Sequence, residues 1–320
     1  MPSRDQIERF RRDLAGLEGV PERIGLAVSG GADSLALLLL AHGACPGRVE
    51  AASVDHRLRA ANAEEAAAVA AVCAALGVPH AILSDPAADI AGASIQAQAR
   101  ALRYRLLAAW ADARGLAVLA TAHHSDDQAE TVLMRLARGA GLGGLAGIRA
   151  DRSEGAIRIV RPLIGWRRAE LAAIVEEAGI APADDPSNRC DAYDRTRYRA
   201  LLAGTDLLPP ERLAASASHL AEAEEALAWA ADRLWHERVR QEGGALLLDP
   251  EGLPPELVRR LAARAIDALR RGATWRRDGL AAALAGAAEG RKVAVAGLLI
   301  VPAEGMLRFE AAPPRTIAAR

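Results

Sequence analysis

The chain has few cysteines and almost no net charge, and each of these features argues against a class of protein. It carries three cysteines among 320 residues. Cys45, Cys73 and Cys190 are far apart in the sequence, so neither a disulfide framework nor a C-x-x-C metal or redox motif is indicated. The formal net charge is −1, which gives no overall case for a nucleic-acid partner. Any surface that binds nucleic acid must therefore come from a local patch.

Membrane and secretory segments are also missing. No stretch of about twenty uninterrupted apolar residues occurs, and residues 1–12 are charged without the apolar core of a signal peptide. These absences predict a soluble, cytoplasmic protein. The chain is too long for one ordinary core, and its 51% hydrophobic residues are enough to fill two domains, with a third left open.

What the sequence does contain is a glycine loop between an apolar strand pattern and an apolar helix pattern. The loop reads Ser29-Gly30-Gly31-Ala32-Asp33-Ser34 and has neither Walker nor Rossmann spacing. Its glycines let main-chain N–H groups approach a ligand, and the following helix offers unpaired donors, so phosphate is the natural occupant. Asp33 is unfavourable there unless a divalent cation such as Mg²⁺ lies between it and the phosphates. The loop predicts a site for a metal-bound nucleotide, and a plain glycine turn is the alternative.

Strand and helix patterns alternate from Ile24 to about Ile180. This alternation predicts an α/β fold with a doubly wound, mostly parallel sheet. Ligands bind beyond the carboxyl ends of the strands in such sheets, and the glycine loop, Asp55-His56 and His123-His124 each follow a predicted strand. The predicted strands are Arg23–Val28, Val49–Val54, His80–Leu83, Ala117–Ala122 and Ile157–Leu163, and the predicted helices are Leu35–His42, Ala63–Leu76, Ile95–Arg114, Asp126–Arg138 and Arg168–Ala178.

The alternation stops beyond Pro182, and a domain boundary is predicted near Thr205. Residues 1–205 would form the nucleotide-binding catalytic domain and residues 206–320 a smaller C-terminal α+β domain, with a helical extension and terminal hairpin as the alternative. The predicted C-terminal elements are helices over Glu211–Gln241, Pro255–Arg270 and Asp278–Ala288 and strands over Ala245–Leu248, Lys292–Val301 and Met306–Phe309.

A second polar segment, His123-His124-Ser125-Asp126-Asp127-Gln128-Ala129-Glu130-Thr131, joins a predicted strand to a predicted helix. Ser125 is expected to cap that helix, and Asp127 and Glu130, three residues apart, share a helix face toward the same sheet edge as Asp33. Capping and dipole matching alone would also explain the two aspartates. A zinc site is disfavoured, because two adjacent histidines cannot both face one ion from regular structure.

Together, these motifs resemble the tRNA(Ile)-lysidine synthetases, members of the PP-loop ATPase (adenine nucleotide alpha-hydrolase-like) superfamily. The resemblance rests on S-G-G-x-D-S and H-H-x-D-D-Q-x-E-T, and it covers about residues 20–200. Arg195-Thr196-Arg197-Tyr198-Arg199 departs from the family, which tends to have Asn at the position of Thr196. The supporting segments are Val54–Arg59, Arg100–Tyr104, Arg138–Ile148, Arg161-Pro162-Leu163 and Asp185-Pro186-Ser187-Asn188.

The resemblance implies a ligase that uses ATP and Mg²⁺ in two steps of tRNA processing. ATP adenylates O2 of the wobble cytidine in a CAU anticodon and releases pyrophosphate, and the free amine of L-lysine then displaces AMP at C2. Asp33 and Asp127 would ligate Mg²⁺, Arg103 would neutralise phosphate charge, and Glu130 with Asp127 would receive the lysine ammonium. His123 or His124 would orient phosphate or accept a proton. Nucleotide binding is expected from Ser29, Gly30, Gly31, Ala32, Asp33, Ser34, Asp55 and His56.

The glycine-rich run Gly139–Gly147 has little side-chain mass to bury. It is interpreted as a mobile lid over the adenylate or, alternatively, as an ordinary surface loop.

RNA contacts are expected from arginines. Seven arginines oppose only Asp267 between positions 259 and 277, a density that favours phosphates, although a solvated face paired with acids would look the same. Trp275 is expected either to stack on a base or to belong to the core. The arginines expected to bind tRNA are Arg195, Arg197, Arg199, Arg270, Arg271, Arg276 and Arg277.

Two other function classes stay open at this point. One is another PP-loop enzyme such as a tRNA thiolase, although thiolases commonly use paired cysteines. The other is a non-enzymatic nucleotide-sensing module. The oligomeric state is also left open, with a homodimer as one alternative.

Overall fold

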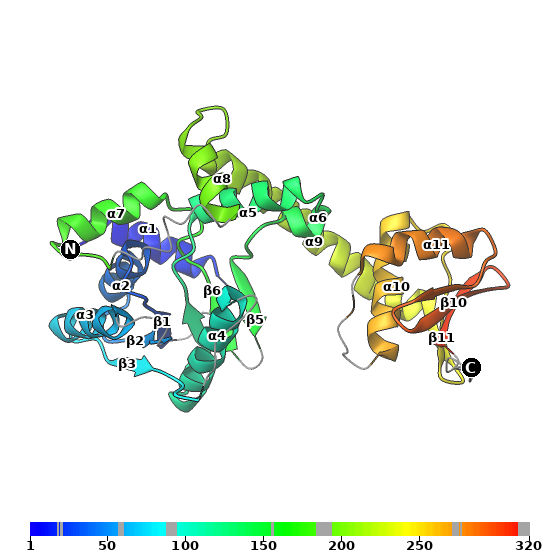
Figure 1. The fold of residues 1–320 in the computed structure, drawn as a ribbon, viewed down its shortest axis with the longest axis horizontal. Helices are drawn as coiled ribbons and strands as arrows, with labels where there is room; N and C mark the ends of the chain where they lie inside the picture. Colours follow the sequence, from blue (N-terminus) through cyan, green and yellow to red (C-terminus); the bar gives the residue numbers. More distant parts are fainter. Residues whose placement is uncertain are drawn as a thin grey trace, which may run out of the picture. The chain divides into compact units, whose positions relative to one another are not determined.

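The chain folds into two compact units, Met1–Ala221 and Glu222–Arg320, each of which is described by itself. The structure is a computed structural model (Figure 1). It describes residues 1–17, 19, 22–56, 61–87, 95–154, 157–183, 194–270, 275 and 277–312. The expected boundary near Thr205 precedes α9 (Pro210–Arg238), a continuous helix that contains the division between the units.

The first unit is built on a six-stranded sheet with the order β3-β2-β1-β4-β6-β5. All neighbouring strands pair in parallel except β5, which pairs antiparallel with β6 at one edge. The strands are β1 (Ile24–Ala27), β2 (Val49–Val54), β3 (His80–Leu83), β4 (Val118–Ala120), β5 (Asp151–Glu154) and β6 (Ile157–Val160).

Helices cover both faces of this sheet. Side chains of α1, α2, α3 and α7 form one core with β1 and β2, whereas α4 packs against β2 and β4 in a separate core (Figure 1). The predicted doubly wound α/β fold is therefore confirmed. The helices of this unit are α1 (Arg4–Ala15), α2 (Ala32–Ala44), α3 (Ala61–Leu76), α4 (Ile95–Ala113), α5 (Ser125–Ala137), α6 (Leu142–Leu145), α7 (Arg168–Glu177) and α8 (Asp194–Ala203).

The central strands and α2 are apolar because neighbouring elements bury them on every side. Leu26 in β1 pairs with Ala51 in β2 and with Ala120 in β4, and all three are almost completely inaccessible to solvent. The residues from Ser34 to Ala41 of α2 are all buried, so that helix is apolar around its whole circumference. A central parallel sheet and its covering helix need this composition.

The sheet order places a topological switch point between β1 and β4. From β1 the chain moves outward through β2 to β3, and it returns through α4 to β4 on the other side of β1. Ligands bind at the carboxyl ends of the strands at such a point. The glycine loop follows β1 and His123-His124 follow β4, so the fold places both predicted motifs at one switch point.

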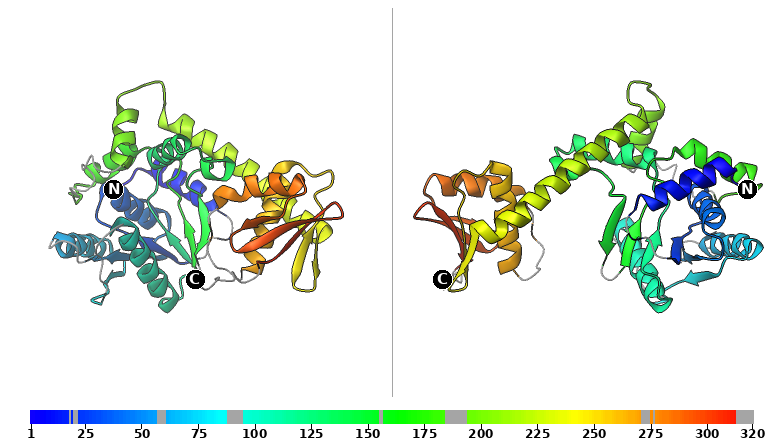
Figure 2. Two further views of the ribbon diagram at one scale, coloured as in Figure 1. Left: turned by 45° about the vertical axis from the view of Figure 1, so that its right-hand side comes forward. Right: turned by 180° about the vertical axis from the view of Figure 1, so that it is seen from behind.

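The second unit contains a five-stranded antiparallel sheet with the order β7-β8-β11-β10-β9. Helices α10 (Pro255–Leu269) and α11 (Leu280–Ala288) pack on it through an apolar core that includes Phe309 and Ile300 (Figure 2). This arrangement matches the expected α+β composition. The strands are β7 (Val239–Glu242), β8 (Ala245–Leu248), β9 (Val293–Val295), β10 (Leu298–Ala303) and β11 (Met306–Ala311).

Some element boundaries differ from the sequence prediction. The long helix ends at Arg238, and the next residues form β7. The strand predicted over Lys292–Val301 is two strands, because Ala296 and Gly297 have φ values of 53° and 79° and form a tight turn. No described helix is long and apolar enough to cross a membrane.

Candidate active site at the switch point

The glycine loop has the geometry of an anion cradle. Gly30 has a φ of +90°, a conformation that favours glycine, and a Cβ there would lie 3.4 Å from the side chains of Val69 and Ala183. Ser34 Oγ donates to the Gly31 carbonyl at 2.9 Å and accepts from the Ser29 N–H at 3.1 Å. These bonds close the loop over the N-terminus of α2, where Ala32 and Asp33 occupy the first turn.

Asp33 and Asp127 converge on one buried imidazole. His124 is completely buried, and its Nε2 lies 3.4 Å from Asp33 Oδ2 and 3.5 Å from Asp127 Oδ2. Burial works to lower the pKa of His124, but the two carboxylates outweigh it and raise this pKa. Burial likewise works to raise the pKa of Asp127, and the neighbouring His124 and Arg195 charges hold it below its usual value.

His124, not Ser125, is the N-cap of α5. Its Nδ1 accepts the Asp127 N–H at 3.3 Å, and its own N–H donates to Asp127 Oδ2 at 3.2 Å. Ser125 instead donates its hydroxyl to the Trp166 carbonyl at 2.7 Å. The expectation that Ser125 caps the helix is wrong, because its side chain ties α5 to the segment before α7.

Asp126 is bonded mainly to the start of α7, and its Oδ2 also lies 3.7 Å from His124 Nδ1. It accepts the Arg168 N–H at 2.8 Å and is held by the Arg167 guanidinium. Burial works to raise the pKa of Asp126, but these bonds to Arg167 and Arg168 lower it. Asp126 therefore anchors the N-terminus of α7, so the two adjacent aspartates have different surroundings.

Glu130 is a buried carboxylate held by two arginines. It is 1% exposed and accepts from Arg195 Nε at 2.7 Å and from Arg199 Nε at 2.8 Å. Arg195 also bonds Asp127 at 3.0 Å. Arg195 thus joins Asp127 to Glu130, and Arg199 holds Glu130 alone. Both arginines lie on α8 and are predicted from the sequence to bind tRNA, as is Arg197, which is exposed.

This pairing was missed at the sequence level. Positions 130 and 199 are 69 residues apart, and only the packing of α8 against α5 brings them together. A pocket of about 480 Å³ adjoins the pair and carries side chains of both charges; its lining includes Asp126, Glu130, Arg167, Arg168, Arg199, Thr205 and Glu211.

His123 points to a different set of partners. Its Nδ1 lies 3.0 Å from Thr121 Oγ1 and accepts from Arg161 Nε at 3.3 Å. Burial lowers the pKa of His123 to about 3, and nearby Arg161 acts in the same direction. Successive side chains of extended backbone point to opposite sides, which is the signal that could have separated the roles of the two histidines.

Two other predicted site residues contact each other across the sheet edge. Arg103 of α4 donates from Nε to His56 Nε2 at 3.3 Å. Burial together with the Arg103 charge lowers the pKa of His56 to about 4. Asp55 directly follows β2, and its N–H is bonded to the Leu83 carbonyl. Arg57 to Arg59 and the Asp185–Asn188 segment lie outside the described residues.

The glycine-rich run is anchored at its C-terminal end. Arg135 donates to the carbonyls of Gly144 and Gly147 at 2.7 and 2.9 Å, and buried Gln128 donates to the Ile148 carbonyl at 3.1 Å. A Cβ on Gly147 would lie 2.3 Å from Gln128 Oε1. A lid that opens along its whole length would have to break all of these bonds.

Metal-binding groups in this region are few. Among the residues that the structure describes, no three His, Cys, Asp or Glu side chains are grouped to hold a metal ion. Asp33 Oδ1 and His124 Nε2 are nevertheless buried without a hydrogen-bond partner among the described residues. Two carboxylates with an unsatisfied oxygen suit Mg²⁺, which usually takes one or two carboxylates and completes its shell with phosphates and water.

The C-terminal arginines are mostly paired. Arg259 and Arg260 contact Glu256, Arg264 contacts Asp232, and Arg277 contacts Asp267. Arg270 donates to the Ala296 carbonyl, and Arg271 and Arg276 lie outside the described residues. Trp275 packs against the core of this unit, and its Nε1 donates to Asp267 at 2.6 Å. Of the two roles expected for Trp275, the structure therefore favours the one in the core.

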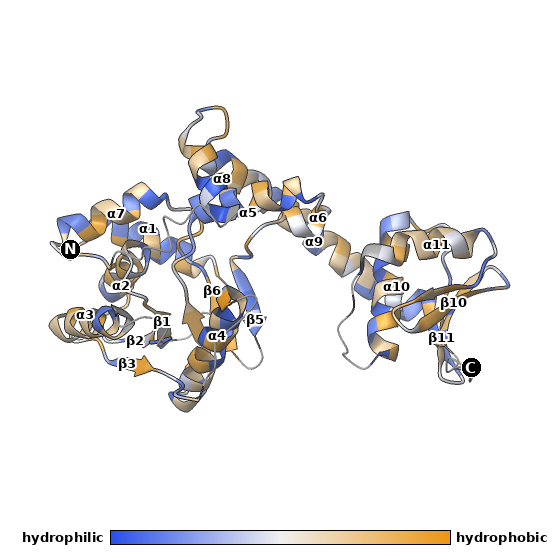
Figure 3. Cartoon of the chain, in the orientation of Figure 1, coloured by the Kyte–Doolittle hydropathy of each residue, from blue (hydrophilic) through white to orange (hydrophobic). Residues whose placement is uncertain are grey.

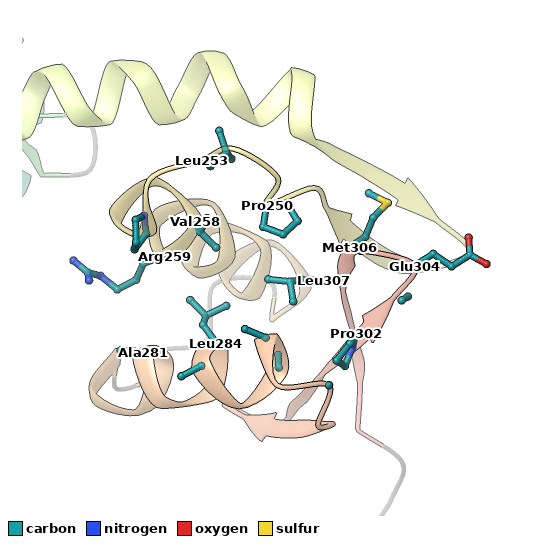
Figure 4. A pocket seen from close by; sticks show the side chains of 17 residues that line it. Pro250, Leu253, Val258, Arg259, Ala281, Leu284, Pro302, Glu304, Met306 and Leu307 are labelled. Atoms are coloured by element: carbon teal, nitrogen blue, oxygen red, sulfur yellow. The ribbon is translucent and has the colours of Figure 1, made fainter.

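An apolar pocket of about 690 Å³ lies between α10, α11 and the β10–β11 turn of the second unit. Figure 4 shows Leu253, Val258, Leu284 and Leu307 around it, with the guanidinium of Arg259 directed away. Its lining contains no counterpart of the glycine loop and its acids.

Comparisons with known proteins agree with this geometry. A family model described as a PP-loop domain matches residues 4–205. The tRNA(Ile)-lysidine synthase of Novosphingobium aromaticivorans is 47% identical over 95% of this chain and 93% of its own length. The tRNA(Ile)-lysidine synthase of Zymomonas mobilis is 43% identical over 97% of this chain and 95% of its own length.

The chain belongs to the tRNA(Ile)-lysidine synthase family. It carries the ATP-binding PP-loop domain, and the resemblance inferred from the motifs is confirmed. A solved structure, the U34-tRNA thiolase NcsA from Methanococcus maripaludis with its [4Fe-4S] cluster, shares the fold with a TM-score of 0.56. Its sequence is 17% identical over 68% of this chain and 79% of that chain. At this identity the likeness shows a shared fold only.

Proposed function

We propose that this protein ligates L-lysine to C2 of the wobble cytidine in the CAU anticodon of tRNA(Ile), using ATP in the cytoplasm. The proposal is supported by one observation above all. Asp33 of the phosphate cradle and Asp127 of α5 meet at a single buried histidine, in a chain 47% identical to a tRNA(Ile)-lysidine synthase.

In the first step, O2 of the cytidine attacks the α-phosphorus of ATP, and pyrophosphate leaves. The N–H groups of Gly30 and Gly31 and the hydroxyls of Ser29 and Ser34 would hold the leaving group. Asp33 and Asp127 would hold Mg²⁺, which when bound neutralises phosphate charge. Arg103 offers a multidentate guanidinium for the charge that develops on the phosphates.

In the second step, the free amine of lysine attacks C2, and AMP leaves with the bonding electron pair. The pocket beside Glu130 suits a zwitterionic amino acid, because its lining carries both carboxylates and guanidiniums. Glu130 already has two guanidinium partners, so a lysine ammonium that binds there replaces at least one of them. Release of Arg195 or Arg199 is therefore part of the proposed binding event.

The thiolase alternative receives less support. The two cysteines among the described residues, Cys45 and Cys73, are both buried and free, and burial raises the pKa of Cys73 to about 11. Such thiols are unsuited to sulfur transfer.

The test is a pair of partial reactions on unmodified tRNA. We expect tRNA-dependent release of pyrophosphate from ATP without lysine, and release of AMP only after lysine is added. ATP turnover that is indifferent to tRNA, or that needs a sulfur donor, would exclude the proposal.

A further inference from the structure

Three arginines lie against Tyr104, and a fourth, Arg149, joins them because its carbonyl accepts from Arg161. The proposed reaction uses none of these four residues. They come from α4 (Arg100), from the segment at the start of β5 (Arg149 and Arg152) and from the end of β6 (Arg161). The guanidinium carbons of Arg100 and Arg152 lie 4.9 and 5.1 Å from the Tyr104 ring centroid. Arg100 also donates to the Tyr104 hydroxyl at 3.4 Å. We call these residues the Tyr104 cluster.

The positive charge of the Tyr104 cluster is largely unbalanced. Within the described part of the chain, Arg152 pairs with Glu154, whereas Arg100, Arg149 and Arg161 pair with no carboxylate. Burial lowers the pKa of Arg161, and the Arg152 and Arg100 charges also lower it against the effect of Tyr104. This contrasts with α8, where Arg195 and Arg199 are matched to acids.

Two donors of the cluster are buried and unused. Arg149 Nη1 and Arg152 Nε have no hydrogen-bond partner in the part of the chain that the structure describes. A buried donor without an acceptor is unfavourable. An oxyanion would accept from several guanidinium N–H groups at once and remove that cost.

The cluster lies at the same sheet edge as the glycine loop but on another strand. Arg161 follows β6 directly, and Arg149 and Arg152 flank the start of β5, which pairs antiparallel with β6. Since β4 separates β1 from β6, the strand ends are about 10 Å apart. Arg161 contacts His123 between them. The cluster thus adjoins the reaction centre without sharing the pyrophosphate cradle.

We propose that the Tyr104 cluster binds a backbone phosphate of the RNA substrate, close to the nucleotide that reacts. This inference rests on the proposed function for the identity of the RNA, but its chemistry requires only a phosphodiester. Such contacts fix the register of an RNA without reading its sequence, so the cluster would hold the wobble position over His123 and His124.

The experiment measures the affinity of the full chain for a CAU anticodon stem-loop RNA, in the absence of lysine and of turnover. Each loop phosphate is replaced in turn by a neutral methylphosphonate. The variant is Arg100→Gln/Arg149→Gln, which leaves buried Arg161 in place. The control, Arg12→Gln, removes one positive charge from an exposed position on α1.

The wild-type protein should lose affinity at one or two methylphosphonate positions, and the double variant should be weaker overall and insensitive at those positions. Its log–log salt slope should fall by about 0.7–0.9 for each phosphate that the variant no longer binds, with unchanged ATP affinity. If ATP affinity falls while RNA affinity holds, the cluster serves the nucleotide and the proposal is wrong. Wild-type behaviour of the folded double variant would also overturn it.

These outcomes are separable from the proposed function. A protein that transfers no lysine but shows the methylphosphonate pattern would disprove the ligase assignment and retain the phosphate site.

Discussion

His124 makes different contacts at its two ring nitrogens. Nδ1 caps α5, and Nε2 faces Asp33 and Asp127. The same residue therefore fixes where the helix begins and where the two carboxylates meet. Because Asp127 belongs to the cap and to the site, its position is set before any ligand binds.

We expect Asp33→Asn and Asp127→Asn each to reduce adenylation by about 10²-fold or more, because each removes a charge that would hold Mg²⁺ against phosphate. Release of pyrophosphate is the measurement. Asp126→Asn is the matched control: it should lower the melting temperature by weakening the anchor of α7, while the folded protein still adenylates tRNA. Full activity of Asp33→Asn or Asp127→Asn would remove that residue from the mechanism.

Glu130→Gln should impair lysine use more than adenylation if Glu130 receives the lysine ammonium, since adenylation of cytidine involves no lysine. The structure adds a second effect, because the variant also leaves Arg195 and Arg199 without their shared acid.

Arg199→Gln separates these two effects. It breaks the same ion pair but keeps the carboxylate, so it should leave the KM for lysine unchanged or lower it. An equal rise of this KM in both variants would mean that Glu130 only anchors α8.

At the scale of elements, the glycine-rich run depends on one close approach between Gly147 and Gln128. Gly147→Ala should destabilise the protein by about 2–4 kcal/mol, because it adds left-handed strain and disrupts the hydrogen bonds of Gln128. Gly139→Ala is the control, since Gly139 has a similar φ of +69° but nothing within 4 Å of an added Cβ. Urea unfolding measures both. Equal destabilisation by the two variants would show that the Gln128 side chain can move aside without loss of stability. Gln128 would then not hold residues 139–147 in place.

Elements were predictable where burial imposes a simple pattern. The central strands and α2 are apolar throughout, and their sequence shows it. β5 was missed because Asp151–Glu154 is a hydrophilic edge strand without apolar alternation (Figure 3). α1 was missed although its signal was present, since Ser3 and Gln6 form a capping box.

The candidate site was predictable to the extent that strand ends locate it. The sheet edge explains why Asp33 and Asp127 meet. It does not explain the partners of Glu130, because those come from α8 through long-range packing, nor the unbalanced charge around Tyr104, which depends on which arginines lack acids.

At the scale of the whole molecule, residues 206–320 are expected to serve tRNA selection and not chemistry. The variant with Arg270, Arg271, Arg276 and Arg277 all changed to Gln should weaken tRNA affinity and lower its salt slope, with ATP affinity unchanged. Of the four substituted arginines, Arg277 already pairs with Asp267. A tRNA phosphate that binds Arg277 would therefore have to replace this acid. Unchanged tRNA binding would place RNA contacts elsewhere, including Arg195, Arg197 and Arg199.

The most direct test of the account is the transfer of labelled lysine to tRNA. The purified protein is incubated with ATP, Mg²⁺, labelled L-lysine and either tRNA(Ile) or methionine tRNA, both with a CAU anticodon, and the digested RNA is analysed for the modified nucleoside. We expect label only in tRNA(Ile), at C2 of the wobble cytidine, and we expect Asp33→Asn to lower its amount by about 10²-fold or more. Label in neither tRNA, with ATP and tRNA both bound, would contradict the account.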